Sequence, residues 1–235
     1  MSVADRISGD TAPEAMAKQV EVLRRMGLSG RFIVLDGPDG CGKSTQVKRL
    51  CQWLAVQGVD TATFRDPGDT QIGEQIRRIL LSPEHLQMST MTELLLYMAS
   101  RTQLWSEKIS PALRTGQCVV LDRWLSSTCA YQGHAGGFGI AKVIGVAEQT
   151  LERVWPDLTV ILDVDLQTAA SRMQRSLDRM EQKGRDYHQN VREGFLRLAR
   201  GREGFVVVDA ARDIDVVHDE IVKAVSAWAK AHPSF

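Results

Sequence analysis

The sequence lacks an excess of charge of either sign, and this limits the partners that it can have. Its 235 residues include 29 lysines and arginines and 29 aspartates and glutamates, so the formal net charge is zero. A neutral chain has no general attraction for nucleic acid or for an anionic membrane, and we expect neither as a partner. Any site for an anion must therefore be local.

Cysteine pairs, long apolar runs and a secretory signal are also missing. The chain has four cysteines, none in a C-x-x-C pair, which are Cys41, Cys51, Cys118 and Cys129. This spacing provides neither a zinc knuckle nor a thioredoxin-like motif, and unpaired cysteines suit a reducing compartment. No apolar run approaches the ~18 residues of a membrane-spanning helix, and the acidic N-terminus has no apolar signal core. We expect a soluble, cytoplasmic protein.

Short apolar runs alternate with amphipathic segments over most of the chain. The apolar runs predict strands at residues 31–36, 60–66, 117–122, 157–165 and 205–210. The amphipathic segments predict helices at residues 43–58, 71–81, 90–115 with a bend at Pro111, and 214–231. Strands without polar alternation, separated by helices, are typical of a parallel sheet buried on both faces. The predicted fold class is α/β, a doubly wound five-stranded parallel sheet flanked by helices.

Two segments stand outside this alternation. Residues 1–30 form an N-terminal extension, a tail followed by a helix over residues 13–26, and residues 31–235 form a single domain. Between the fourth and fifth strands, the strongly charged residues 166–201 carry Arg172, Arg175, Arg179, Lys183 and Arg185. Taken alone, this segment is either a solvated helical hairpin or a mobile cationic lid over about residues 166–190.

A glycine-rich turn between the first strand and its helix carries a nucleotide-binding motif. Residues 37–44, GPDGCGKS, fit the pattern G-x-x-x-x-G-K-[ST] in the strand-to-helix context that this motif requires. In such a loop the backbone N–H groups and the helix dipole bind phosphates, the lysine reaches the β- and γ-phosphates, and the hydroxyl holds Mg²⁺. The sequence therefore predicts a fold of the P-loop NTPase type that binds ATP and Mg²⁺. The expected contacts are Gly37, Gly40, Cys41, Gly42, Lys43, Ser44 and Thr45.

The third predicted strand ends on two opposite charges, Asp122 and Arg123. A local ion pair would account for these charges alone. Ligands of an open α/β sheet bind at the carboxyl ends of its strands, however, so the pair is also placed to serve a charged ligand. No N-K-x-D motif of a GTPase occurs, and the chain is short for an oligomeric ATPase. A small kinase with a lid fits the layout better.

Several segments together resemble the thymidylate kinase family. GPDGCGKST resembles the family's phosphate loop, RDPGDTQIGEQIR (65–77) its REPGGT motif and following helix, and DRWLSSTCAYQG (122–133) its DRY…AYQG motif. RSLDRMEQKG and VREGFLRLA resemble its lid and the next helix. The similarity runs from about Arg31 to the C-terminus in the family's order and spacing. The resemblance implies a homodimer that phosphorylates dTMP to dTDP with ATP and Mg²⁺, in dTTP synthesis.

On the acceptor side, the resemblance implies a role for each matched position. Tyr97 stacks on the thymine, and Arg101, four residues later on the same helix face, bonds the base edge. Tyr131 lies against the deoxyribose C2′, and Asp39 accepts from the 3′-hydroxyl. Without the resemblance, Tyr97 is simply a core aromatic residue. The complete set of implied acceptor contacts is Asp39, Asp66, Arg77, Tyr97, Arg101, Arg123, Thr128, Tyr131 and Gln132.

For phosphoryl transfer, the resemblance implies that cations align two phosphate groups that repel each other. Arg77 and Arg123 grip the monophosphate, since an arginine fork suits a phosphate dianion, and Asp122 serves the Mg²⁺ region. The phosphate loop has Gly40 where some family members carry a basic residue, so the missing cation is expected from the lid. The implied catalytic residues are Lys43, Asp122, Arg123, Arg175 and Arg179, with Arg172 near the adenine or the phosphates.

Three positions depart from the family pattern. Asp66 stands where Glu is usual, Asp69 where Gly is usual, and Trp124 where Tyr or His is usual. A shorter Asp66 shifts any contact with the phosphate-binding arginines or Mg²⁺, Asp69 adds negative charge near an anionic substrate, and Trp124 lacks a hydroxyl. Two alternatives therefore stay open, which are another nucleotide or deoxynucleoside kinase, and a nucleotide-binding module without phosphoryl transfer.

Overall fold

The computed structural model describes residues 27–173 and 178–233. The helix expected over residues 13–26 lies outside the described residues, and so does Arg175. Within the described ranges, no helix is long and apolar enough to cross a membrane.

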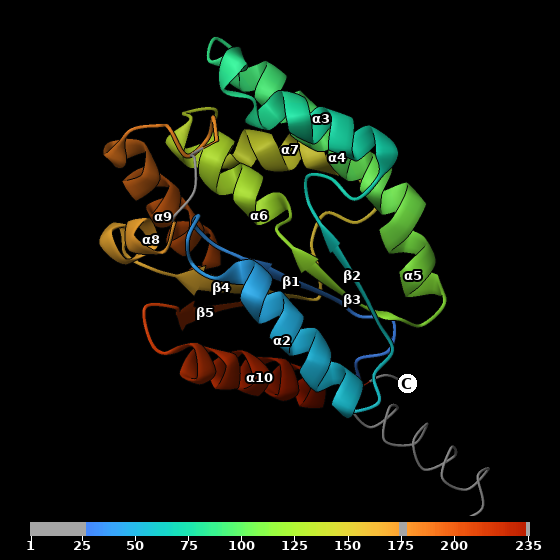
Figure 1. The fold of residues 1–235 in the computed structure, drawn as a ribbon. Coiled ribbons are helices and arrows are strands. Elements are labelled where there is room, and N and C mark those ends of the chain that lie inside the picture. The colour runs from blue at the N-terminus through green and yellow to red at the C-terminus, as the bar shows by residue number, and fades with distance from the viewer. Residues whose placement is uncertain (1–26, 174–177, 234–235) are drawn as a thin grey trace, which may run out of the picture.

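All five predicted strands are present and form one parallel sheet (Figure 1). Their bounds are β1 Phe32–Asp36, β2 Thr61–Arg65, β3 Cys118–Asp122, β4 Leu158–Asp163 and β5 Phe205–Asp209. The strand order is β2-β3-β1-β4-β5, so β1 lies between β3 and β4. In the register of the sheet, Leu35 pairs with Asp122, and Asp36 pairs with Ile161. The carboxyl ends of β1 and β3 therefore meet at one edge of the sheet.

Helices cover both faces of this sheet. They are α2 Lys43–Val56, α3 Gln71–Leu81, α4 Thr90–Leu104, α5 Ser110–Arg114, α6 Leu125–Thr128, α7 Ile140–Thr150, α8 Leu166–Arg172, α9 Arg185–Ala199 and α10 Ile214–Ala231. The remaining helical segments are a 3₁₀ turn, η1 Pro83–His85, and two π-helical segments, η2 Trp105–Ile109 and η3 Cys129–Ala135. The predicted helices at 71–81 and 214–231 have the expected bounds, whereas α6, η3 and α7 were not predicted from the sequence.

The core explains why the strands show no polar alternation. Successive side chains of a strand point to opposite faces. Ile33 and Leu35 pack in one cluster with side chains of α2 and α10, and Phe32 and Val34 pack in a second cluster with side chains of α4 and α7. Figure 1 shows α2 and α10 on one side of the sheet and α4 and α7 on the other. Both faces of β1 are therefore buried, and the prediction of a doubly wound sheet is confirmed.

The helix predicted over residues 90–115 is interrupted before its proline. A π turn, η2, separates α4 from α5 at Trp105–Ile109. Proline has no N–H to donate, and its ring crowds the carbonyl group four residues earlier. For Pro111 that carbonyl belongs to Glu107, which lies inside the π turn. The helix therefore departs from α geometry in the turn that precedes Pro111.

Trp124, which departs from the family pattern, belongs to the core. Its side chain is fully buried. The ring lies edge-on to Phe32, with centroids 5.3 Å apart, and 6.3 Å from the ring of Trp105. Its Nε1 donates a hydrogen bond to the carbonyl oxygen of Val154 at 2.9 Å. The departure therefore changes the packing of the core under β1, and the Trp124 side chain adds no polar group to the edge of the sheet.

This packing predicts a large loss of stability on truncation. Trp124→Ala should lower the free energy of unfolding by about 3–5 kcal/mol, the range for large aromatic side chains removed from a core. Urea denaturation followed by circular dichroism measures this loss. Val56→Ala is the matched control, because Val56 is 83% exposed and should change stability by no more than about 0.5 kcal/mol. A Trp124→Ala variant as stable as the control would contradict this placement.

Candidate active site

The phosphate loop joins β1 to α2 and requires glycine at three positions. Gly37, Gly40 and Gly42 have φ values of 142°, 77° and 91°, which other residues rarely adopt. A Cβ atom on Gly40 would lie only 2.5 Å from the carbonyl oxygen of Ala169 in α8. A side chain at Gly40 would therefore push the loop away from the segment between β4 and β5.

Lys43 is the first residue of α2, and its ammonium group lies inside the phosphate loop. Nζ donates hydrogen bonds to the carbonyl oxygens of Gly37 at 3.0 Å and Pro38 at 2.7 Å. It also lies 3.4 Å from Sγ of Cys41, a residue that packs in the core cluster beneath the loop. Burial raises the pKa of the Cys41 thiol. The Cys41 side chain thus supports the lysine and does not line the cavity described below.

Ser44 and Asp122 bring two oxygen atoms together beside the loop. Ser44 Oγ donates a hydrogen bond of 2.7 Å to Asp122 Oδ2, at the end of β3. Mg²⁺ prefers oxygen ligands and usually takes only one or two from the protein, with phosphate oxygens and water as the others. Among the described residues, no group of three or more His, Cys, Asp or Glu side chains forms a fuller metal cage. The Ser44–Asp122 pair therefore fits a magnesium ion that binds together with a nucleotide.

A cavity of about 570 Å³ lies against the phosphate loop and is called the phosphate cavity here. Its lining includes cationic side chains from five separate segments of the chain, namely Lys43, Arg65, Arg77, Arg123 and Arg172. Its lining includes Gly40, Gly42, Lys43, Ser44, Thr45, Asp122, Arg123 and Arg172. All of these were predicted from the sequence, whereas the predicted Gly37 and Cys41 do not line it.

A second, smaller cavity of about 110 Å³, the acceptor cavity, adjoins the first. Every residue that the family resemblance assigned to the acceptor lines it, namely Asp39, Asp66, Arg77, Tyr97, Arg101, Arg123, Thr128, Tyr131 and Gln132. The two cavities share Asp39, Asp66, Arg77, Arg123 and Glu181. Two ligands bound in these cavities would therefore meet beside the same arginines.

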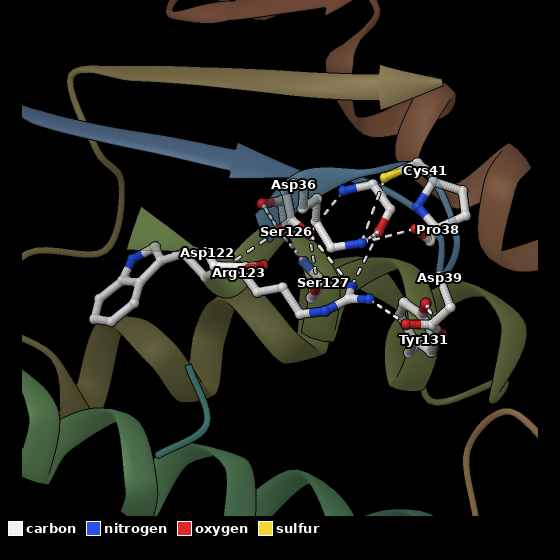
Figure 2. A network of polar contacts seen from close by, with 12 residues as sticks. Asp36, Pro38, Asp39, Cys41, Asp122, Arg123, Ser126, Ser127 and Tyr131 are labelled. Atoms are coloured by element: carbon white, nitrogen blue, oxygen red, sulfur yellow. Dashed lines mark hydrogen bonds and ion pairs between the residues drawn. The ribbon is translucent and has the colours of Figure 1, made fainter. Parts of the chain in front are cut away.

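Arg123 lies at this junction and is held by several acceptors (Figure 2). Its Nη1 donates to the carbonyl oxygen of Gly37 at 3.0 Å and to Ser127 Oγ at 2.9 Å, and its Nη2 donates to Asp39. The Tyr131 hydroxyl donates to the other oxygen of Asp39 at 2.6 Å. Burial alone would raise the pKa of Asp39, but Arg123, Lys43 and this hydroxyl together lower it. Asp39 is thus an ionised acceptor facing both cavities.

Asp36, at the end of β1, is a functional residue that sequence reasoning missed. It is fully buried, and it accepts hydrogen bonds from Gly37 N at 2.8 Å, Ser126 Oγ at 2.5 Å, and Ser127 N and Oγ at 2.9 and 2.7 Å. Arg123 Nη1 lies 3.6 Å from its Oδ1. Asp36 therefore joins the phosphate loop to the start of α6. The available signal was an acidic residue ending a wholly apolar strand.

Asp66 and Arg101 form an ion pair buried within the acceptor cavity wall. Arg101 Nε donates to Asp66 Oδ2 at 2.7 Å, and Arg101 Nη2 donates to Thr128 Oγ1 at 2.9 Å. Burial raises the pKa of Asp66, an effect that Arg101 opposes. The sequence predicts that the shorter Asp66 shifts any contact with the phosphate-binding arginines or Mg²⁺, and in the structure its carboxylate pairs with Arg101.

Asp69 does not add its charge to either cavity. Its backbone has a φ of 58°, which explains why a glycine suits this position in the family. Its Oδ2 accepts from the backbone N–H of Arg65 at 2.6 Å, and its Oδ1 lies 3.7 Å from the Arg65 guanidinium. The Asp69 carboxylate is thus turned toward the end of β2, beside an Arg65 guanidinium that also pairs with Glu74 at 2.8 Å.

The arginines of the expected lid lie in different environments. Arg172, at the end of α8, donates to the carbonyl oxygen of Ala210 at 2.8 Å and lines the phosphate cavity, while Arg175 lies outside the described residues. Arg179 is 3% exposed, and it pairs with Glu93 at 2.6 Å and donates to the carbonyl oxygen of Leu80 at 2.7 Å. Arg179 lines neither cavity, so its expected contact with the transferred phosphate is absent here. The buried acid that binds it comes from α4, which the lid sequence alone does not reveal.

Comparisons with known proteins agree with this geometry. A sequence model of the family described as thymidylate kinase matches residues 35–221. The chain is 43% identical to thymidylate kinase of Caldanaerobacter subterraneus subsp. tengcongensis over 205 residues, which is 86% of this chain and 98% of that protein. It is also 43% identical to thymidylate kinase of Symbiobacterium thermophilum over 196 residues, covering 83% and 92% of the two chains.

A solved structure extends the likeness from sequence to fold. The crystal structure of thymidylate kinase from Ehrlichia chaffeensis matches with a TM-score of 0.65 and 28% identity, over 84% of this chain and 98% of that chain. Residues 35–221, which the family model matches, contain the phosphate loop, the Asp122–Arg123 motif and every residue that lines the acceptor cavity. The chain belongs to the thymidylate kinase family of P-loop nucleoside monophosphate kinases.

Proposed function

We propose that this chain transfers the γ-phosphate of ATP to the 5′-phosphate of dTMP, producing dTDP and ADP for dTTP synthesis. The observation that carries this proposal is the pair of adjoining cavities, which share Asp39, Arg77 and Arg123. The family phosphorylates dTMP to dTDP. Residues 31–235 are the proposed kinase domain, and the free cysteines of the chain suit a cytoplasmic enzyme.

On the donor side, the phosphate loop binds the triphosphate of ATP. Lys43 releases the carbonyl oxygens of its own loop and turns its ammonium group to the β- and γ-phosphates. Ser44 and Asp122 would hold Mg²⁺, which would supply positive charge to neutralise and orient the phosphates. Arg172 lies at the same cavity, where it adds a cation near the adenine or the phosphates.

On the acceptor side, dTMP occupies the acceptor cavity. Tyr97 stacks on the base, while Arg101, Thr128 and Gln132 contact its polar edge. Tyr131 lies against C2′, where its ring leaves no room for a ribose hydroxyl. Asp39 accepts from the 3′-hydroxyl, a role that agrees with its lowered pKa.

The transfer requires two anionic phosphates to approach each other in line. An oxygen of the dTMP phosphate attacks the γ-phosphorus, and the bond from that phosphorus to the β–γ bridging oxygen breaks, so ADP leaves with that electron pair. Arg77 and Arg123 bind the acceptor phosphate, and Arg123 reaches both cavities. Preorganised cations of this kind stabilise the charge that spreads over the transferred group. Arg175 is proposed as the lid cation; Arg179 takes that role only after it leaves Glu93.

The two alternatives are separated by their acceptors. A nucleoside kinase would phosphorylate thymidine and leave Arg77 and Arg123 without an acceptor phosphate to bind. A nucleotide-binding module would bind ATP without turnover of any acceptor.

A panel of acceptors tests the proposed substrate. ADP release should be fastest with dTMP, slower with dUMP, and at least about 100-fold slower with dCMP, dGMP, AMP and thymidine, since a site built around hydrogen bonds rejects mismatched polar edges strongly. A coupled ADP assay at saturating ATP gives kcat/KM for each acceptor. Equal turnover of a purine monophosphate would refute the assignment, and thymidine as the best acceptor would favour the nucleoside kinase.

Removal of the phosphate-loop cation should abolish transfer. Lys43→Ala should lower kcat by at least about 100-fold, because a cation directed at the transferred phosphate acts mainly in the transition state. Lys48→Ala, on the exposed side of the same helix, is the control and should retain kcat. Circular dichroism checks that both variants are folded, and a Lys43→Ala enzyme with normal kcat would exclude the proposed role.

We also propose that the chain forms a homodimer through the α3–α4 hairpin. Large apolar side chains are exposed along this hairpin and the turn between its helices, namely Ile72, Ile79, Leu86, Met91 and Leu95. A soluble surface rarely leaves apolar side chains gathered in this way unless a partner covers them.

A charge placed in this surface should prevent assembly. Leu95→Glu should convert a dimer into a monomer at micromolar concentration, as measured by sedimentation velocity, because each copy would bury an unpaired carboxylate. Val56→Glu introduces the same charge at an exposed apolar residue of α2 and should leave the dimer intact. A wild-type monomer, or a dimeric Leu95→Glu variant, would disprove this interface.

A further inference from the structure

Glu93 is a buried acid in the first turn of α4 that the proposed mechanism does not use. Its side chain is 2% exposed. Three side chains from two other segments converge on it. Gln132 Nε2 donates to its Oε1 at 2.7 Å, Arg179 lies 2.6 Å from its Oε2, and Lys183 lies 3.6 Å from its Oε1. Both carboxylate oxygens of Glu93 therefore face amide or cationic donors and act as acceptors.

This acceptor decides how the amide of Gln132 is oriented. The amide group has a donating nitrogen at one end and an accepting oxygen at the other. Because Glu93 acts as the acceptor, the nitrogen of Gln132 must face it. The 2.7 Å hydrogen bond from Gln132 Nε2 to Glu93 Oε1 shows this orientation. The oxygen is then at the opposite end of the amide. Gln132 is 1% exposed and lines the acceptor cavity, beside Tyr97, Arg101 and Thr128.

An amide oxygen at this position distinguishes pyrimidines by the edge of the base. Thymine and uracil carry a hydrogen on N3, which such an oxygen can accept. Cytosine has a lone pair on N3, so two acceptors would face each other in a site that excludes water. A buried polar group left without its partner costs far more than the net gain from one hydrogen bond.

We propose that Glu93 is a positioning residue for base selection, which fixes the Gln132 amide so that its oxygen accepts from N3–H of thymine or uracil and rejects cytosine. This inference rests on the proposed binding of dTMP in the acceptor cavity. Glu93 touches neither the substrate nor the reacting atoms, and it acts only through Gln132. The competing explanation is that Glu93 serves only to hold Arg179 and Lys183, and thereby the segment after α8.

Glu93→Gln separates these explanations, because the new side chain has a single accepting oxygen. Arg179 and Gln132, which each donate to one oxygen of Glu93, would compete for it. The Arg179 guanidinium takes that oxygen in preference, since a hydrogen bond from a charged donor is stronger than one from an amide. The new amide nitrogen then faces Gln132, whose own amide must turn over to accept from it. Its nitrogen would face the cavity, where it donates to N3 of cytosine and opposes N3–H of thymine.

The measured quantity is the ratio of kcat/KM values between acceptors, obtained with saturating ATP. In Glu93→Gln, the ratio of dTMP to dCMP should fall at least about tenfold, the effect of one lost and one mismatched hydrogen bond. The ratio of dTMP to dUMP should stay unchanged, because both bases carry N3–H. A purely structural defect would lower kcat/KM for all three acceptors to the same extent, and both ratios would keep their wild-type values.

Two further variants complete the test. Lys183→Met removes a cation from Glu93 without changing its hydrogen bond to Gln132, so the dTMP to dCMP ratio should stay unchanged whatever happens to kcat. Gln132→Met removes the amide itself and should lower that ratio at least about tenfold, even if Glu93→Gln fails to fold. An unchanged ratio in a folded Glu93→Gln enzyme, or in Gln132→Met, would overturn the inference. Failure of the wild-type enzyme to use dTMP would instead refute the proposed function.

Discussion

Two carboxylates near the end of β1 hold the guanidinium of Arg123, and the site is assembled around this contact. Asp36 and Asp39 lie on either side of the first turn of the phosphate loop, and Arg123 follows the neighbouring strand β3. A carboxylate as deeply buried as Asp36 is tolerated only when donors surround it. Gly37, Ser126 and Ser127 supply those donors. The need to satisfy one buried charge therefore brings the donor loop and the acceptor motif together.

Local pairing also explains how a chain without net charge builds a site for two anions. Each arginine near the cavities has a carboxylate or carbonyl oxygen beside it, as in the Asp66–Arg101 and Asp39–Arg123 pairs. These partners hold the guanidinium groups in place before a substrate binds. Preorganised groups lose little free energy in rearrangement when charge develops on the transferred phosphate.

The departures from the family pattern have structural explanations. Trp124 fills the core between Phe32 and Trp105, Asp69 turns its carboxylate toward Arg65, and Asp66 pairs with Arg101. None of these places an uncompensated negative charge against the acceptor phosphate. The departures therefore give no support to a nucleotide-binding module without phosphoryl transfer.

The sequence by itself determined the strands and the phosphate loop, and its resemblance to the family named the residues of the acceptor cavity. The strands and the loop depend on short-range rules, because an apolar run must be buried, a glycine must occupy an unusual φ, and a parallel sheet brings the carboxyl ends of its strands to one edge. Only the tertiary structure decided which charges pair. Glu93 lies 39 residues from Gln132 along the chain, and Arg179 could bind either a phosphate or this buried acid. Pairing is decided by burial and geometry across the fold, because a charge removed from water must take the partner that lies nearest to it.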